Sequence, residues 1–239
     1  MLEQLKLTDP MDDIMRIQSD FLTSKSMEVR KSLGQFFTGS IVSEYMASFI
    51  LKPKIENIRI LDAGAGIGIL TASTALHCLN MGCRSIHAVL YEIDKDAIMY
   101  LKETMGIVQN IFEHSNLFFS YEIHCEDFVL ARPDKDDNIE PFDVSVINPP
   151  YFKYRVKDSP YAKVAADLYR GDPNIYASFM AITLACMKHT GQMVTITPRS
   201  FTNGLYFKGV RSYLLTQSSL NLIHIFKHRD KVFKNSDSS

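Results

Sequence analysis

Apolar and polar residues follow two different periods along this chain, and the pattern switches repeatedly between that of a strand and that of a helix. Short apolar runs rich in Val and Ile predict buried strands at 58–62, 85–93, 121–124, 142–147, 192–197 and 221–226. Amphipathic stretches predict helices at 11–24, 41–51, 69–80, 95–113, 175–188 and 205–215. Because strands and helices alternate almost throughout, we expect an α/β fold: a doubly wound, mainly parallel sheet with helices on both faces.

Polar residues mark the starts of several predicted helices. Ser40 precedes the helix at 41–51 and Glu44 lies near its third position, so Ser40 is expected to cap that helix. Asp94 and Asn174 stand in the same place before the helices that begin at 95 and 175. The Asp-rich stretch 132–140 is expected to be a solvated connection.

Length and composition bound the class of protein. A chain of 239 residues, 46% of them hydrophobic, can bury the core of one large domain. We expect a helical extension over 1–30, a single α/β domain over 31–234 and a polar tail over 235–239. No stretch approaches the about 20 apolar residues of a membrane span, and no signal peptide is visible. The four cysteines lack the close pairs of a zinc site, which favours a cytoplasmic protein with reduced thiols.

Charge is unevenly distributed along the chain. Residues 1–150 contain 13 Lys and Arg against 22 Asp and Glu, whereas residues 151–239 contain 13 against 5. A basic second half is typical of an enzyme with one side facing phosphates. Chance segregation of surface charge is the alternative interpretation.

The sequence Asn148-Pro149-Pro150-Tyr151 closes the strand predicted at 142–147. Two prolines cannot continue a sheet ladder, so the chain turns there, at the strand edge where open α/β sheets bind ligands. The amide oxygen of Asn148 and the carbonyl oxygen of Pro149 could accept both N–H donors of a conjugated amino group. The nitrogen would thereby regain its lone pair as a nucleophile, with Tyr151 stacked on the flat group that carries it. The alternative is a plain turn that ends a strand.

A glycine-rich turn, Ala63-Gly64-Ala65-Gly66-Ile67-Gly68, follows the strand that ends at Asp62. A strand, a glycine-rich turn and a helix present backbone N–H groups and a helix amino end to a ligand. The third glycine lies one residue earlier than the dinucleotide-binding fingerprint requires. D-x-G-x-G-x-G is instead the pattern of S-adenosylmethionine (AdoMet) binders, with a generic α/β turn as the alternative.

Two acidic residues lie at the end of, or just after, the next two predicted strands. Glu92 lies 24 residues after Gly68, where it could accept hydrogen bonds from both ribose hydroxyls. Asp127 could accept an N–H from the adenine of a cofactor while Phe128 covers the ring face. An ordinary surface acid is the alternative for Asp127.

Residues 152–172 are long, basic and aromatic. An irregular segment of more than about 12–15 residues in a compact domain is usually a lid, a binding loop or disordered. We expect basic side chains of 153–170, together with Arg199, Lys208, Arg211 and the stretch 227–234, to contact phosphates. Such contacts position a protein on a nucleic acid without selecting a sequence.

Three segments, in this order and spacing, resemble the γ-type DNA adenine-N6 methyltransferases of bacterial restriction–modification systems: Leu33-Gly-Gln-Phe-Phe-Thr-Gly39, Leu61-Asp-Ala-Gly-Ala-Gly-Ile-Gly68 and Asn148-Pro-Pro-Tyr151. The resemblance runs from about residue 28 to 233. It implies the Rossmann-like sheet of class I AdoMet-dependent methyltransferases, with the catalytic domain at 31–234.

The resemblance also implies a cofactor, AdoMet, and a role for each matching residue. Residues expected around the cofactor are Phe37, Thr38, Asp62, Gly64, Gly66, Glu92, Ile93, Asp127 and Phe128. Residues expected at the reacting base are Asn148, Pro149, Pro150, Tyr151 and, on the other face of the base, Phe207. Asn at position 148 favours adenine N6 over cytosine N4, and the implied direct transfer needs no metal.

The chain departs from this family in one respect. Family members continue into a target-recognition domain, and no segment here resembles one, so we expect recognition to come from another chain or from a part not included in this sequence. The implied partners are double-stranded DNA and, in such systems, a separate specificity domain or subunit and a cognate endonuclease. The competing functions are a protein glutamine-N5 methyltransferase, an RNA amino-methyltransferase, and an inactive fragment that binds AdoMet or DNA.

Overall fold

A computed structural model describes residues 9–24, 38–53, 55–151, 160–170, 174–205 and 207–226. Phe37, which was predicted to contact the cofactor, lies outside these residues, as do part of the predicted basic segment 152–172 and the stretch 227–234. Among the described residues, no helix is both long and apolar enough to cross a membrane.

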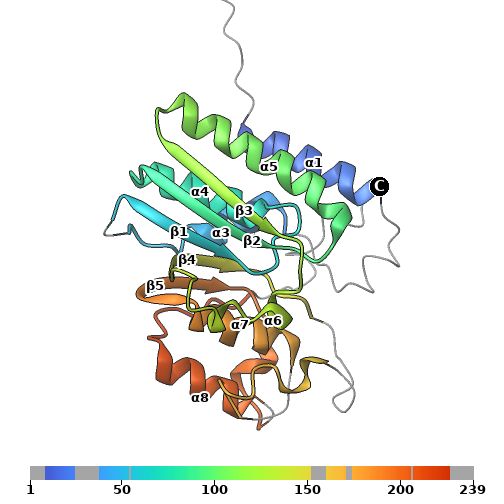
Figure 1. Ribbon diagram of the computed structural model, residues 1–239, viewed down its shortest axis with the longest axis vertical. Coiled ribbons are helices and arrows are strands. Elements are labelled where there is room, and N and C mark those ends of the chain that lie inside the picture. Colours follow the sequence, from blue (N-terminus) through green and yellow to red (C-terminus); the bar gives the residue numbers. More distant parts are fainter. Residues whose placement is uncertain are drawn as a thin grey trace, which may run out of the picture.

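Five parallel strands form one sheet in the order β3-β2-β1-β4-β5 (Figure 1), as the alternating pattern predicted. The strands are β1 (Asn57–Asp62), β2 (Ser85–Tyr91), β3 (Phe118–His124), β4 (Phe142–Ile147) and β5 (Met187–Thr195). The strand order reverses between β1 and β4, which are hydrogen-bonded neighbours. The carboxyl ends of strands at such a reversal are where open α/β sheets bind ligands.

Four helices cover one face of the sheet (Figure 1): α1 (Pro10–Ser24), α3 (Ser40–Ala47), α4 (Ile69–Asn80) and α5 (Lys95–His114). Their apolar side chains share one core with Ile60, Ala88 and Val144 of the sheet. Within this core Phe21 of α1 packs edge-on against Tyr100 of α5, with ring centroids 5.1 Å apart. Helix α1, which lies in the predicted N-terminal helical extension, therefore packs into the same core as the sheet.

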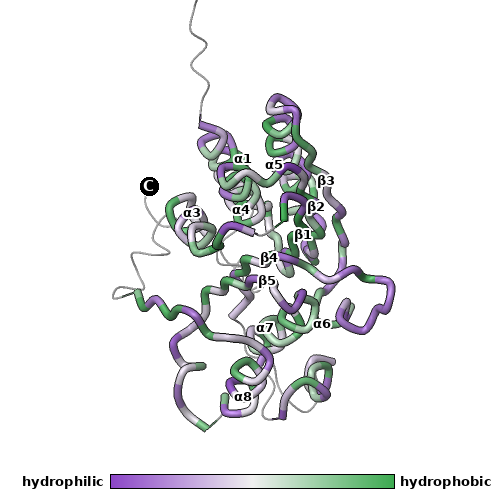
Figure 2. Tube along the Cα trace, turned by 90° about the vertical axis from the view of Figure 1, so that its left-hand side faces the viewer, coloured by the Kyte–Doolittle hydropathy of each residue, from purple (hydrophilic) through white to green (hydrophobic). Residues whose placement is uncertain are grey.

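The other face carries α6 (Phe128–Ala131), α7 (Ile175–Ala185) and α8 (Lys208–Gln217), and Figure 2 shows the two layers on opposite sides of the strands. Three short 3-10 helices accompany them: η1 (Pro133–Lys135), η2 (Pro160–Lys163) and η3 (Arg199–Thr202). Helix α7 contacts both β5 and α8, and its first nine residues are buried. A helix enclosed on both sides has no polar face, which explains its largely apolar sequence.

Two of the three predicted helix caps are confirmed. The Asp94 carboxylate accepts the backbone N–H of Asp96 at 3.1 Å, and the Asn174 side chain accepts that of Tyr176 at 3.2 Å. The prediction for Ser40 is wrong. Gly39 occupies the capping position in extended conformation and its carbonyl accepts the N–H groups of Val42 and Ser43, so Ser40 is the first helical residue. That helix ends at Ala47 and not at Leu51.

The boundaries around β5 also differ from the prediction. Helix α7 ends at Ala185, and β5 begins at Met187, which pairs with Phe142. The register with β4 then shifts before Val144, and Gly191 lies inside the strand at the irregularity. A Cβ on Gly191 would come within 2.9 Å of the Phe142 carbonyl oxygen. Strand pairing, and not local propensity, therefore decides this boundary.

The predicted strand at 221–226 is wrong for the described residues. They form no ladder with any described strand, and Leu222, Ile223 and Ile225 are more than half exposed. The stretch instead contacts α3, where the Tyr45 hydroxyl lies 3.0 Å from His224 Nδ1. An apolar, β-branched run predicts a strand only where a partner strand is within reach.

Candidate functional site

The residues predicted to carry the chemistry gather at the carboxyl edge of the sheet. Asp62 ends β1, Glu92 follows β2 and Asn148 follows β4. β1 and β4 are paired in the sheet, and the Ser145 hydroxyl of β4 also donates to the Leu61 carbonyl of β1 at 2.7 Å. The chain therefore places its glycine-rich turn beside its Asn-Pro-Pro-Tyr turn at the reversal of strand order.

The glycine-rich turn is tied to the end of β2 by two hydrogen bonds. Ala65 N–H donates to the Tyr91 carbonyl at 2.9 Å, and Gly66 N–H donates to Glu92 Oε2 at 2.7 Å. Gly66 has a φ of +55°, a left-handed conformation that favours glycine. A Cβ placed on Gly66 would meet no described atom within 4 Å, whereas one on Gly64 would contact the Phe179 ring at 3.5 Å. The side of the turn at Gly66 is therefore open.

Glu92 is buried and holds two backbone segments together. Its Oε1 accepts Asp94 N–H and its Oε2 accepts Gly66 N–H, both at 2.7 Å. Burial raises the pKa of Glu92 to about 7, although the two backbone bonds oppose the rise. Each oxygen keeps a second lone pair. The predicted contact with ribose hydroxyls is compatible with this geometry and stays a prediction.

Asp62 is 2% exposed and only one of its carboxylate oxygens is hydrogen-bonded by a side chain. Oδ2 accepts from the Thr71 hydroxyl at 2.6 Å, while Oδ1 is buried with no hydrogen-bond partner among the described residues. Burial raises the pKa of Asp62 to about 6, against the lowering effect of the Thr71 and Gly64 bonds. A buried acceptor without a partner is costly, so Oδ1 is suited to a donor that a ligand brings.

The Asn148 amide is held on both sides. Its Nδ2 donates to the Thr38 hydroxyl at 3.1 Å, and its Oδ1 accepts from the Tyr151 hydroxyl at 2.7 Å. The same Tyr151 hydroxyl lies 2.6 Å from the Ile196 carbonyl oxygen. A hydroxyl has one proton, so Tyr151 can turn it to Ile196 when another donor approaches Asn148 Oδ1. Thr38 thus joins the segment before α3 to the predicted catalytic turn.

Tyr151, which contacts this amide, belongs to a cluster of three aromatic rings. Tyr176, at the start of α7, lies edge-on to Tyr151, with their ring centroids 6.2 Å apart. The ring centroids of Tyr176 and Phe207 are 5.4 Å apart. Phe207 immediately precedes α8 and is buried. The structure thus brings both predicted base-stacking residues to one central ring. Sequence reasoning missed Tyr176, because nothing but its place after the Asn174 cap distinguishes it.

Asp127, Phe128 and Ile93, which were predicted near the cofactor, differ in their burial and in their contacts. Asp127 caps α6, with Oδ1 accepting Leu130 N–H at 3.0 Å, while Oδ2 accepts from the Tyr161 hydroxyl at 2.5 Å. Phe128 is 1% exposed and its ring lies 5.2 Å from that of Tyr91, inside the core. Ile93 is 56% exposed beside Glu92. The cofactor contacts of these residues stay predictions, and the contact of Tyr161 with Asp127 was not foreseen.

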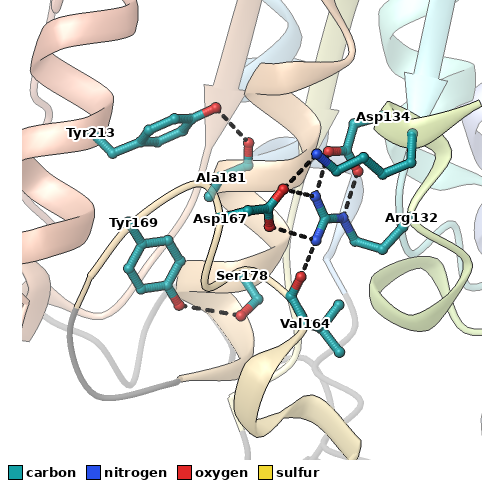
Figure 3. Close-up of polar contacts among 9 residues, drawn as sticks. Arg132, Asp134, Val164, Asp167, Tyr169, Ser178, Ala181 and Tyr213 are labelled. Carbon is teal, nitrogen blue, oxygen red and sulfur yellow. Dashed lines mark hydrogen bonds and ion pairs between the residues drawn. The ribbon is translucent and has the colours of Figure 1, made fainter. Parts of the chain in front are cut away.

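The prediction that 132–140 is a solvated connection holds for the exposed residues 135–138 and 140 but not for Arg132 and Asp134. Arg132 donates to the Asp134 and Asp167 carboxylates and to the Val164 carbonyl (Figure 3), with 13% of the Arg132 side chain exposed and 2% of that of Asp134. Lys135 Nζ lies 2.5 Å from Asp167. Because 132–135 and 160–170 are far apart in sequence, their pairing is a tertiary contact that local composition cannot show.

One of the residues predicted to contact phosphate has a different role. The Arg211 guanidinium donates to the carbonyls of Phe201, Asn203 and Gly204, at 2.8 to 3.2 Å. It therefore stabilises the turn between η3 and α8. Arg199 and Lys208 are exposed.

Comparison with known proteins gives a consistent match. The model of the Eco57I restriction-modification methylase family matches residues 72–233. The chain is 35% identical over 218 residues to the type II methyltransferase M.BsuBI of Bacillus subtilis, a match that covers 87% of this chain and 42% of that protein. The chain thus spans less than half the length of this relative.

Solved structures agree on the fold. A protein from Listeria monocytogenes assigned to the class I S-adenosylmethionine-dependent methyltransferases superimposes with a TM-score of 0.57 at 17% identity, over 86% of this chain and 59% of that one. The methyltransferase subunit of a type I restriction-modification system from Streptococcus thermophilus gives 0.56 at 17% identity, over 76% and 38%. The sheet and its two helix layers are therefore those of class I AdoMet-dependent methyltransferases.

Proposed function

Because the chain belongs to the family of Eco57I restriction-modification methylases, we propose that it is the catalytic part of a site-specific DNA methyltransferase that methylates adenine N6. The observation that carries the proposal is the Asn148 amide. It is held by Thr38 and Tyr151 at the reversal of strand order, beside the glycine-rich turn.

The residues of the turn fit AdoMet. The buried Asp62 oxygen without a partner suits a donor on the methionine part, and the open side of Gly66 leaves room for it. Glu92 would receive the ribose hydroxyls, and Asp127 with Ile93 would lie at the adenine. AdoMet, when bound, supplies a methyl group made electrophilic by the sulfonium that carries it.

Asn148 and Pro149 act on the nitrogen that receives the methyl group. Asn148 Oδ1 and the Pro149 carbonyl oxygen accept its two N–H bonds, and Tyr151 turns its own proton to the Ile196 carbonyl to make this possible. Hydrogen bonds that strengthen as the nitrogen becomes positive favour the transition state over the bound substrate. The new N–C bond would form as the S–C bond of AdoMet breaks and S-adenosylhomocysteine leaves, and the methylated amino group would then lose one proton to solvent. Positioning of the two reactants contributes the remainder of the rate. Because the proton is lost from a nitrogen that is already positive, no strong base is required.

The target base has to leave the duplex, because its amino group is otherwise paired. Tyr151 and Phe207 would then contact its two faces, and the ring of Tyr176 packs against both of these rings. Stacking between aromatic side chains and a base does not depend on a sequence and suits a flipped nucleotide.

A protein glutamine or an RNA base offers the same conjugated amino group. The family match and the pair of rings favour a DNA base over a glutamine side chain, which has no ring face to stack. Double-stranded DNA is accordingly the proposed substrate, with a separate specificity domain or subunit and a cognate endonuclease as the proposed partners.

The test is methyl transfer from tritiated AdoMet to unmethylated duplex DNA, structured RNA and a peptide release factor, followed by nucleoside analysis. We expect label in DNA, recovered as N6-methyladenine. Label recovered as N4-methylcytosine would contradict the adenine assignment. Label found only in RNA or in protein would overturn the DNA assignment altogether.

A further inference from the structure

Residues 160–170 lie against the predicted adenine end of the cofactor site. Tyr161, in the 3-10 helix η2, donates its hydroxyl proton to Asp127 Oδ2 at 2.5 Å across 34 residues of sequence. Helix α6, which Asp127 caps, contacts η2. A segment that follows the Asn-Pro-Pro-Tyr turn in sequence therefore contacts a residue of the predicted cofactor site.

The position of this segment is held by several independent contacts. Arg132 bonds the Val164 carbonyl and both oxygens of Asp167, and Lys135 pairs with Asp167 (Figure 3). Although burial opposes it, the bonds from Lys135 and Arg132 lower the pKa of Asp167 to about 2, so the pairing persists over the working pH range. Further along, the Tyr169 hydroxyl lies 3.2 Å from the Ser178 hydroxyl of α7.

The hydrogen bond to Asp127 has a defined polarity. Burial and the bond to Asp127 raise the pKa of Tyr161 well above its ordinary value, so the phenol stays protonated and acts as the donor. Asp127 then accepts on both oxygens, from Leu130 N–H on Oδ1 and from Tyr161 on Oδ2. A carboxylate held from two sides cannot rotate, and each oxygen keeps one lone pair for a further donor.

We propose that Tyr161 is a positioning residue of the adenine pocket, which orients the Asp127 carboxylate to accept the adenine amino group. The segment 160–170 thereby becomes part of the cofactor site. This inference rests on the proposed function, because it takes Asp127 as the acceptor for the adenine. Pre-orientation of an acceptor improves discrimination between ligands that do and do not present a donor to it.

The experiment compares two ligands by calorimetry: S-adenosylhomocysteine, and S-inosylhomocysteine, in which a carbonyl oxygen replaces the adenine amino group. The quantity measured is the ratio of their two dissociation constants. We expect the protein to prefer the adenine compound and Tyr161→Phe to reduce that preference by about three- to tenfold, because the lost bond only orients the acceptor and therefore matters less than the more than tenfold effect of a direct hydrogen bond to a charged group. Tyr169→Phe removes a hydroxyl of the same segment that contacts Ser178, and should leave the preference unchanged.

Asp127→Asn separates the inference from the proposed function, and Asn remains a good helix cap. If Asp127→Asn abolishes or inverts the preference and Tyr161→Phe reduces it, the inference is supported. If Asp127→Asn abolishes the preference, but Tyr161→Phe leaves it unchanged or weakens the binding of both ligands equally, Tyr161 does not orient Asp127 and the inference is overturned. If Asp127→Asn has no effect, the adenine assignment fails and the inference with it.

Discussion

Two buried carboxylates, Asp62 and Glu92, stand at the ends of neighbouring strands without a cation beside them in the described structure. Burial raises their pKa values to about 6 and about 7, above the ordinary range of carboxyl groups. A raised pKa in the folded state means that the stability these groups contribute is present below about pH 4 and is lost as pH rises through about 6 to 7. A ligand that donates hydrogen bonds to the ionised forms offsets this loss.

This gives a pH-dependence for ligand binding. The probe is 5′-deoxy-5′-methylthioadenosine, which has the ribose and adenine but no amino acid group that titrates. If the ribose hydroxyls donate to ionised Glu92, affinity should increase roughly tenfold between about pH 6 and pH 8 and then level off, because about a tenth of Glu92 is ionised one pH unit below its pKa.

Isothermal titration at four pH values measures this effect, with Glu92→Gln as the control. The variant cannot ionise, so its affinity should vary little with pH. A flat profile for the unaltered protein would show that Glu92 does not receive the ribose.

The sequence was sufficient to locate those site residues that lie at the ends of predicted strands. Asp62, Glu92 and Asn148 each lie at or just after the end of a predicted strand, and parallel strands bring such residues to one edge. Tyr161 and Tyr176 could not be found in this way. Their contacts with Asp127 and Tyr151 join distant parts of the chain and depend on how α6, α7 and η2 pack.

At the scale of elements, α8 packs closely against the end of the segment 160–170. A Cβ on Gly209, in the first turn of α8, would overlap the carbonyl group of Arg170. By contrast, Gly106 in the middle of α5 has open space, with nothing within 4 Å of a Cβ. The two helical glycines therefore allow a matched test of this contact.

Gly209→Ala should destabilise the protein by about 1–3 kcal/mol, the usual cost of overpacking, because backbone has to move away from the new methyl group. Gly106→Ala should stabilise it by up to about 1 kcal/mol, since alanine is the better helix former. Thermal unfolding followed by circular dichroism measures both. Equal shifts of the two melting temperatures in the same direction would contradict the close approach of Gly209 to Arg170.

Elements were predictable where their ends carry local signals. Helix α4 spans the predicted 69–80, with a glycine turn before it and Gly82 after it. Helix α5 begins at the predicted position because Asp94 caps it. The strand predicted at 192–197 overlaps the second half of β5. The start of β5, and the lack of a ladder between 221–226 and any described strand, were not predictable, because both depend on whether a neighbouring strand offers a ladder.

At the scale of the whole molecule, the chain spans 42% of the length of its Bacillus subtilis relative, and its described basic residues include exposed side chains such as Arg170, Arg199 and Lys208. Contacts from such side chains to phosphates carry no sequence information. We therefore expect this chain to bind duplex DNA weakly, in the range of about 10⁻⁴–10⁻⁶ M, with strong dependence on salt.

Fluorescence anisotropy with labelled duplexes of scrambled sequence at two salt concentrations tests this expectation. All duplexes should bind alike, and the affinity should fall steeply at the higher salt. Tight binding of one sequence that persists at high salt would show that these 239 residues select a target by themselves.

The most direct test of the proposed mechanism is the rate of methyl transfer to DNA by Asn148→Ala, measured beside its affinity for AdoMet. Because Asn148 acts on the target nitrogen in the transition state, we expect the rate to fall by about 10²–10³-fold while the cofactor affinity stays nearly unchanged. Phe207→Ala should lose less, since one stacking contact contributes about 1–3 kcal/mol. An Asn148→Ala variant that transfers methyl groups at nearly the original rate would contradict the assignment of this amide to catalysis.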